Sequence, residues 1–104
     1  MIEFKNVRLT LTAEDDLERL RDFLYYQTKS YEVLRKFDDE IENALKEIED
    51  FPELYPQAFE ESTMRKKIVW RYIIFYVEVQ DYISITHIFH QSEDWLNKLK
   101  EELS

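Results

Sequence analysis

The segment RKKIVWRYIIFYVEVQDYISITHIFH, which runs from Arg65 to His90, decides the fold of this 104-residue chain. It is rich in β-branched and aromatic residues, which favour strands, and the VQD in its middle is typical of a turn. The pattern predicts three consecutive strands, with the first break placed at Arg71. Their expected bounds are about 65–70, 72–79 and 82–89.

The residues before this segment predict one strand and two helices. The alternation in IEFKNVRLTL indicates a strand at about 2–10, and Thr12 is a good N-cap for a helix at about 13–28 because acids follow it. Ser30 is a candidate cap for a second, amphipathic helix, which Pro52 ends because proline cannot continue the backbone ladder. The apolar stripe of that second helix comprises Leu34, Phe37, Ile41, Ala44, Leu45, Ile48 and Phe51.

The residues after the strands predict a last helix. Ser92 is its expected cap, and its inward face consists of Trp95, Leu96, Leu99 and Leu103. The order strand–helix–helix–strand–strand–strand–helix predicts an α+β fold, with a helical hairpin packed on one face of a small antiparallel sheet. Because the length is near the common domain size, we expect a single domain over residues 1–104.

The composition excludes several classes of site. The chain has no glycine, so the usual glycine-rich phosphate loops are absent, and it has no cysteine for disulfides or thiolate chemistry. We therefore expect no cofactor. No apolar run approaches the roughly 20 residues of a membrane span, and we interpret the chain as cytoplasmic. The net charge of −9 argues against non-specific nucleic-acid binding.

The acidic charge is concentrated in one segment. Ten acids and one base lie between Asp38 and Ser62, while the flanking parts of the chain are balanced. We interpret this segment either as a solvated helix face or as a surface that repels the wrong partner and attracts a basic one.

The two histidines of the chain lie three residues apart near the end of the last predicted strand. Because side chains alternate along a strand, one face is expected to hold Ile83, Ile85, His87 and Phe89, and the other Tyr82, Ser84, Thr86, Ile88 and His90. His87 is then a hydrogen-bonded core or boundary histidine. His90 is a candidate acid or base, or it fixes the strand-to-helix corner. No shared metal site is expected, because the imidazoles point apart and no cysteine completes a ligand set.

A basic patch lies at the start of the strand segment. Alternation places Arg65 and Lys67 on one face of the strand and Lys66 on the other, with Arg71 in the following break. Such side chains either keep an edge strand from pairing with neighbouring sheets or contact a macromolecule.

Four segments of the chain carry a family pattern in the right order. They are VRLTLTAEDDLERLRDFL, a first strand and helix; IEDFPELYP, a helix end; RKKIVWRYIIFYVEV, a strand pair; and ITHIFHQSEDW, a closing segment. Together they resemble the RelE/ParE superfamily of type II toxin–antitoxin toxins and cover nearly the whole chain. The resemblance implies a growth-inhibiting toxin of the plasmid-stabilisation type, neutralised by a co-encoded antitoxin.

The resemblance leaves two mechanisms open. RelE-type members cut ribosome-bound messenger RNA, and ParE-type members block DNA gyrase. If the chain is a ribonuclease, the resemblance implies that the catalytic residues come from Arg65, Lys67, Arg71 and His90.

Two arginines that the ribonuclease mechanism uses are absent. The chain has Ile73 and Ser92 at those positions, and the acid Glu93 stands beside the second one. Screened charges at a distance do not replace a cation in contact with phosphate, so the sequence slightly favours a binding mechanism.

The expected partners follow from the same resemblance. They are the cognate antitoxin and either the ribosome with its messenger or gyrase, with no membrane and with DNA bound only through the antitoxin complex. Lys66, Tyr76 and Trp95 are the candidate partner-binding residues. An alternative hypothesis is a degenerate, non-toxic member that only binds antitoxin, which the unusual acidity supports.

Overall fold

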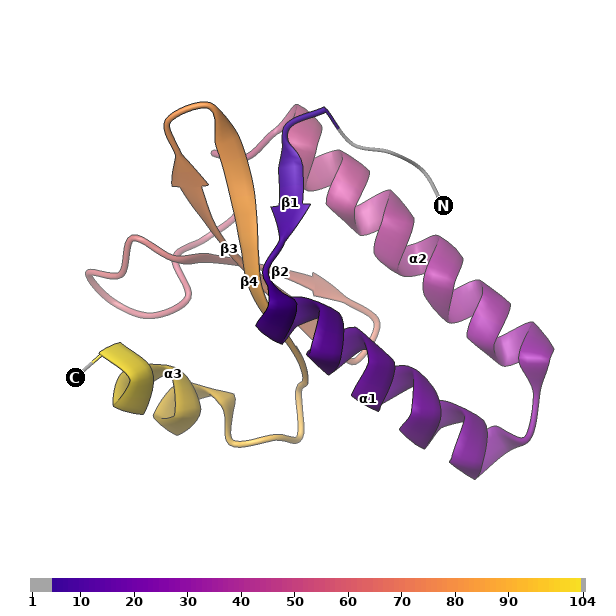
Figure 1. Ribbon diagram of the computed structural model, residues 1–104. Coiled ribbons are helices and arrows are strands. Elements are labelled where there is room, and N and C mark those ends of the chain that lie inside the picture. Colours follow the sequence, from indigo (N-terminus) through magenta and orange to yellow (C-terminus); the bar gives the residue numbers. More distant parts are fainter. Residues whose placement is uncertain (1–4, 104) are drawn as a thin grey trace.

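The computed structural model describes residues 5–103. It contains two helices side by side, a four-stranded sheet, and a short helix that lies apart from the other two (Figure 1). In chain order the elements are β1 (Val7–Leu9), α1 (Leu11–Thr28), α2 (Tyr31–Asp50), β2 (Arg65–Val69), β3 (Tyr72–Val79), β4 (Tyr82–His90) and α3 (Trp95–Leu103). The predicted α+β fold and its order of elements are confirmed.

The sheet is mixed, whereas an antiparallel one was expected. Its strand order is β1-β4-β3-β2, and β3 is antiparallel to both of its neighbours, but β1 runs parallel to β4. Parallel neighbours need a long connection, and the chain between β1 and β4 contains both long helices and two strands. β1 is also shorter than the strand predicted at 2–10, of which residues 2–4 lie outside the described part.

Helix α1 begins two residues earlier than predicted, because Thr10 and not Thr12 is its cap. The Thr10 hydroxyl accepts a hydrogen bond from the Ala13 backbone N–H at 3.1 Å. The same hydroxyl donates to the backbone carbonyl of Thr86 in β4 at 3.2 Å. Both threonines suit a cap by residue type, and this bond to the sheet favours Thr10.

Helix α2 has the predicted cap and most of the predicted stripe. Ser30 accepts the Val33 N–H at 3.2 Å, and the stripe from Leu34 to Ile48 is buried as expected. Phe51 is the exception: it is the C-cap, its φ of −138° leaves the helix, and its side chain is 61% exposed.

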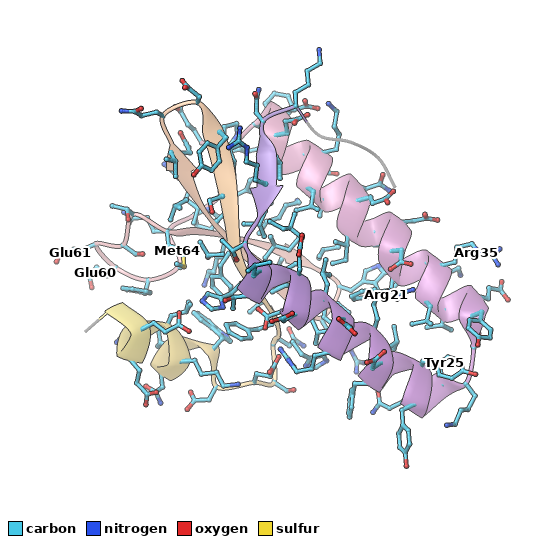
Figure 2. All side chains as sticks on the ribbon, viewed as in Figure 1. Arg21, Tyr25, Arg35, Glu60, Glu61 and Met64 are labelled. Atoms are coloured by element: carbon cyan, nitrogen blue, oxygen red, sulfur yellow. The ribbon has the colours of Figure 1, made fainter. Side chains whose placement is uncertain are left out.

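An ion pair ties α1 to α2 on the outer side of the hairpin. Arg21 donates to both carboxylate oxygens of Asp38, at 2.8 and 3.2 Å. Figure 2 shows Arg21 between the two helices, while Arg35 projects from α2 into solvent.

A β-bulge at Thr86 changes which residues of β4 share a face. Phe75 pairs with His87, but the next residue of β3, Tyr76, pairs with Ile85, so Thr86 is an extra residue in β4. A bulge shifts the alternation that follows it. The predicted faces are therefore wrong beyond Thr86: Ile88 joins Ile85 in the core beneath the hairpin.

Two apolar clusters cover the two faces of the sheet. The larger one lies between the sheet and the hairpin and includes Phe37, Ile48, Ile74, Tyr76, Ile85 and Ile88. The smaller one lies beneath α3 and the segment that precedes β2, and includes Met64, Ile73, Phe75, Phe89 and Leu99. In Figure 2, Met64 lies beside the sheet, whereas Glu60 and Glu61 project from the outer tip of that segment.

The connections around β3 and α3 differ from prediction in detail. The turn after β2 consists of Trp70 and Arg71, and Trp70 has a left-handed φ of 54°. α3 begins at Trp95, so Ser92 lies in the preceding turn and does not cap the helix. On the expected inward face of α3, Leu99 is buried and Trp95 is half-buried; the side chain of Leu103 is outside the described part.

Candidate functional site

A groove of about 720 Å³ opens between α1, the β2–β3 turn and the end of β4. Phe23 and Trp70 line it and are 59% and 51% exposed. Arg71, Tyr72 and His90 supply polar groups to the same lining. We call this site the His90 groove.

The sheet register assembles the polar part of the His90 groove. Tyr72 at the start of β3 pairs with His90 at the end of β4, and their rings meet edge to face with centroids 5.5 Å apart. The Gln91 N–H donates to the Arg71 carbonyl at 2.7 Å, which holds the turn beside the end of β4. Arg71 and His90, which are 19 positions apart in the sequence, therefore line one site.

The His90 ring is held in one tautomer. Its Nδ1 accepts the Ser92 backbone N–H at 3.1 Å and lies 2.7 Å from the Ser92 hydroxyl oxygen. A nitrogen that accepts a backbone N–H carries no proton in the neutral ring, so the proton of neutral His90 is on Nε2. Ser92, which sequence analysis noted as a helix cap and as the site of a missing arginine, orients this histidine.

The carboxylate of Glu93 makes contacts with three nearby residues. Its carboxylate accepts the His90 backbone N–H at 2.7 Å, lies 3.0 Å from Arg19 and lies 3.5 Å from Lys98. Arg19 is therefore neutralised where it borders the groove. Arg71 is exposed and has no ion pair within residues 5–103.

Arg65 and Lys67 are the other two candidate catalytic residues. Arg65 holds the β2 edge to the segment after α2, and Lys67 holds it to α2 itself. Arg65 donates to the Tyr55 carbonyl at 2.6 Å, and the Lys67 ammonium lies 2.8 Å from the Glu47 carboxylate. Burial disfavours the charge of Lys67, but hydrogen bonds to Glu47 and Tyr55 outweigh it and raise its pKa. Neither side chain lines the His90 groove.

The three candidate partner-binding residues differ in accessibility. Tyr76 is fully buried, and its hydroxyl donates to the Pro52 carbonyl at 2.6 Å; burial raises its pKa to about 12. It presents no surface to a partner in this structure. Lys66 lies 4.9 Å from the Trp95 ring centroid, and this partly exposed pair is accessible on the α3 side.

His87 lies on the opposite face from His90 and is buried, as predicted, with 7% of its surface exposed. Its Nε2 is 2.7 Å from a Glu102 oxygen, and its Nδ1 is 3.5 Å from an Asp16 oxygen. Sequence analysis missed Asp16 as a buried residue. Its spacing from Ala13 and Leu20 on the inward side of α1 was the signal that this acid faces the sheet.

Within the described residues, no group of three metal-ligating side chains lies close enough together to hold an ion. Within the same part of the chain, the helices are too short or too polar to cross a membrane.

A helical hairpin on a four-stranded sheet, followed by a short third helix, is the α+β fold that the resemblance to the RelE/ParE superfamily predicted. A sequence model described as the ParE toxin of the type II toxin-antitoxin system, parDE, matches residues 7–95. The chain therefore belongs to the ParE toxin family.

A solved structure agrees with this assignment at the level of fold. It is described as the chromosomal ParDE TA system from P. aeruginosa and superposes with a TM-score of 0.70 at 18% sequence identity. The match covers 82% of this chain and 94% of that one. No curated protein matches the sequence.

Proposed function

We propose that this ParE-family toxin acts in the cytoplasm and stops growth by binding DNA gyrase through the His90 groove, without cutting RNA, and that a co-encoded antitoxin neutralises it. The observation that carries the proposal is the charge of the groove. Arg71 is the cation of its lining that no acid in the described chain neutralises, and the carboxylate of Glu93 borders the same space.

That charge is poorly suited to RNA cleavage. A metal-free ribonuclease needs a base for the 2′-hydroxyl, cations for the phosphorane-like transition state and an acid for the leaving oxygen. The groove offers one imidazole and one unpaired guanidinium. Ile73, where an arginine was expected, is buried in the cluster beneath α3, on the other face of the sheet from the groove.

The same lining is well suited to a protein partner. Tryptophan and arginine are among the residues that most often dominate binding energy at interfaces, and phenylalanine is enriched there. Phe23, Trp70 and Arg71 supply all three within one groove.

A competing function is supported by one observation. Arg71 and His90 are both in the groove, and the tautomer of His90 places a proton on Nε2, where a general acid would carry it. Ribosome-dependent cleavage of messenger RNA by these two residues is therefore the alternative that the experiment must distinguish from gyrase binding.

Purified toxin and four variants distinguish the two mechanisms. In a gyrase supercoiling assay, Trp70→Asn and Arg71→Ala should each weaken inhibition at least tenfold, since hot-spot truncations cost about 2 kcal/mol or more. Asparagine tolerates the left-handed backbone at position 70, so the turn is preserved. His90→Gln keeps a side-chain N–H donor at position 90 and should inhibit nearly as well as the wild type. Arg35→Ala, which removes an exposed cation that does not line the groove, is the matched control.

The opposite pattern supports the ribonuclease. Cleavage of ribosome-bound messenger by the wild type, with loss of about a hundredfold in His90→Gln, would overturn the gyrase proposal. Inhibition that survives in both Trp70→Asn and Arg71→Ala would show that gyrase does not bind through the His90 groove.

The antitoxin part of the proposal has its own test. Induced expression should arrest bacterial growth, and co-expression of the neighbouring gene's product should restore it. We propose that the exposed pair of Lys66 and Trp95 contributes to that contact, so Lys66→Glu should weaken binding of the neighbour's product and Lys36→Glu on α2 should not. A chain that binds this product tightly without arresting growth is instead the degenerate, non-toxic member.

A further inference from the structure

The His87 side chain connects three elements of the fold. It projects from β4 between a carboxylate of α1, Asp16, and a carboxylate of α3, Glu102. Its ring stacks on Phe89 with centroids 5.1 Å apart and planes 15° from parallel. It is therefore fixed in position, with one nitrogen directed at each carboxylate.

α3 depends on its docking for its structure. It has nine residues, and an isolated helix of that length is not stable in water. Leu99 is 1% exposed beneath it, and Trp95 packs on Phe75 with centroids 5.3 Å apart, so apolar contacts hold its first two turns. The contact between His87 and Glu102 holds its last turn.

The contact with both carboxylates is complete only when the imidazole is protonated. The neutral ring has one N–H, so one of its two nitrogens then presents a lone pair to a carboxylate. In the structure Nδ1 is buried and makes no hydrogen bond within the described chain, although the Asp16 oxygen is 3.5 Å away. The Asp16 carboxylate, opposed by burial and aided by Glu102, raises the pKa of His87.

The charges that face His87 come from two helices. From α1, Asp16 faces it directly, and Arg19 lies 3.6 Å from the far oxygen of Asp16. From α3, Glu102 contacts it directly, and Lys98 and Glu101 border the same hollow. The two groups in contact are both anionic, so this environment favours the imidazolium.

We propose that His87 is a pH-sensitive latch, whose imidazolium bridges Asp16 and Glu102 and holds the last turn of α3 on the sheet. When the pH rises and the ring loses its proton, the single remaining N–H serves only one of the two carboxylates, and the last turn of α3 is held less tightly. Because a helix of nine residues is not stable on its own, the packing of Trp95 on Phe75 at its first turn loosens as well. The proposal concerns α3 alone and is independent of the target of the toxin.

Tryptophan fluorescence tests the latch in the full chain. In a Trp70→Asn background, Trp95 is the only tryptophan, and its emission reports on the docking of α3. A titration from pH 5.5 to 9 should give one step whose midpoint lies above about 6.5, the ordinary value for histidine. Proton NMR of the imidazole rings should give the same midpoint for His87, and His90→Gln should leave the step unchanged.

Three variants decide the outcome. His87→Gln should abolish the fluorescence step, and Glu102→Gln should lower its midpoint, because one of the two carboxylates that favour the imidazolium loses its charge. Glu60→Gln, on the remote loop, should leave it unchanged. A step that persists in His87→Gln, or a midpoint that Glu102→Gln does not move, overturns the latch. If His87→Gln does not fold, the exposed Glu102→Gln still decides.

Discussion

His87 and His90 lie on one strand, three residues apart, and have opposite environments. His87 is buried between two carboxylates and joins α1, β4 and α3. His90 is partly exposed, its Nδ1 contacts Ser92 in the turn that follows, and it lines a groove. The difference shows that one residue type serves structure on one face of the sheet and is available for binding or chemistry on the other.

The bulge at Thr86 precedes both histidines and determines which residues accompany them. It places Ile88 in the core beneath the hairpin, while His87 and Phe89 stack under α3. Asp16 of α1 accepts the Ile88 backbone N–H at 3.0 Å, two residues beyond the bulge. A buried acid thus stabilises the part of β4 where the ladder is irregular.

The largest effect on stability is expected at Asp16. Asp16→Ala leaves the buried N–H of Ile88 without an acceptor and removes a carboxylate from His87, which together should cost about 2–4 kcal/mol. Urea unfolding followed by circular dichroism measures this loss. Asp16→Asn retains an acceptor oxygen and should lose less. A loss below about 1 kcal/mol for Asp16→Ala would show that the bulge does not need this acid.

A smaller and pH-dependent effect is expected at His87. At pH 6, His87→Gln should lower the free energy of unfolding by about 1–2 kcal/mol, because buried bonds to charged groups are lost. The folded-state pKa is raised above the unfolded value of about 6.5, so the stabilisation is fully present below pH 6.5 and disappears as the pH rises through the folded pKa. Urea curves of both proteins from pH 5.5 to 9 should therefore converge, and a gap that is constant or grows with pH contradicts the assignment.

The cap of α1 should contribute about 1 kcal/mol. Thr10→Ala removes the hydroxyl that accepts the Ala13 N–H and donates to the carbonyl of Thr86, so it weakens both the helix start and the bulge. Thr12→Ala, two residues away within the first turn, is the matched control and should change the unfolding free energy by less than about 0.5 kcal/mol. Equal effects from the two variants would mean that the contact with β4 does not select the cap.

Local patterns were sufficient to predict the order of elements, the Ser30 cap and most of the α2 stripe. They failed where a contact between distant residues decided the outcome. The bond from Thr10 to Thr86, the parallel pairing of β1 with β4 and the bulge itself join residues far apart in the chain. Strict alternation along β4 contained no information about an extra residue at position 86.

The candidate site was predictable in part for the same reason. His90 and Arg71 were singled out by residue type, and the pairing of β3 with β4 brings them to one groove. Phe23 and Trp70 were missed as groove residues because the exposure of an aromatic side chain depends on what packs beside it. Lys67 was singled out as a candidate catalytic cation, but it pairs with Glu47, 20 positions earlier.

The smallest effect on stability is expected at His90, and it completes the comparison. Its ring contacts Ser92 and the edge of Tyr72, and these contacts are partly exposed. His90→Ala should therefore change the free energy of unfolding by about 0.5 kcal/mol or less. Urea unfolding beside His87→Gln is the direct measurement. A loss as large as that of His87→Gln would mean that His90 is a structural residue of the strand-to-helix corner. A small loss leaves its Nε2–H free for a partner, since a stable fold does not require it.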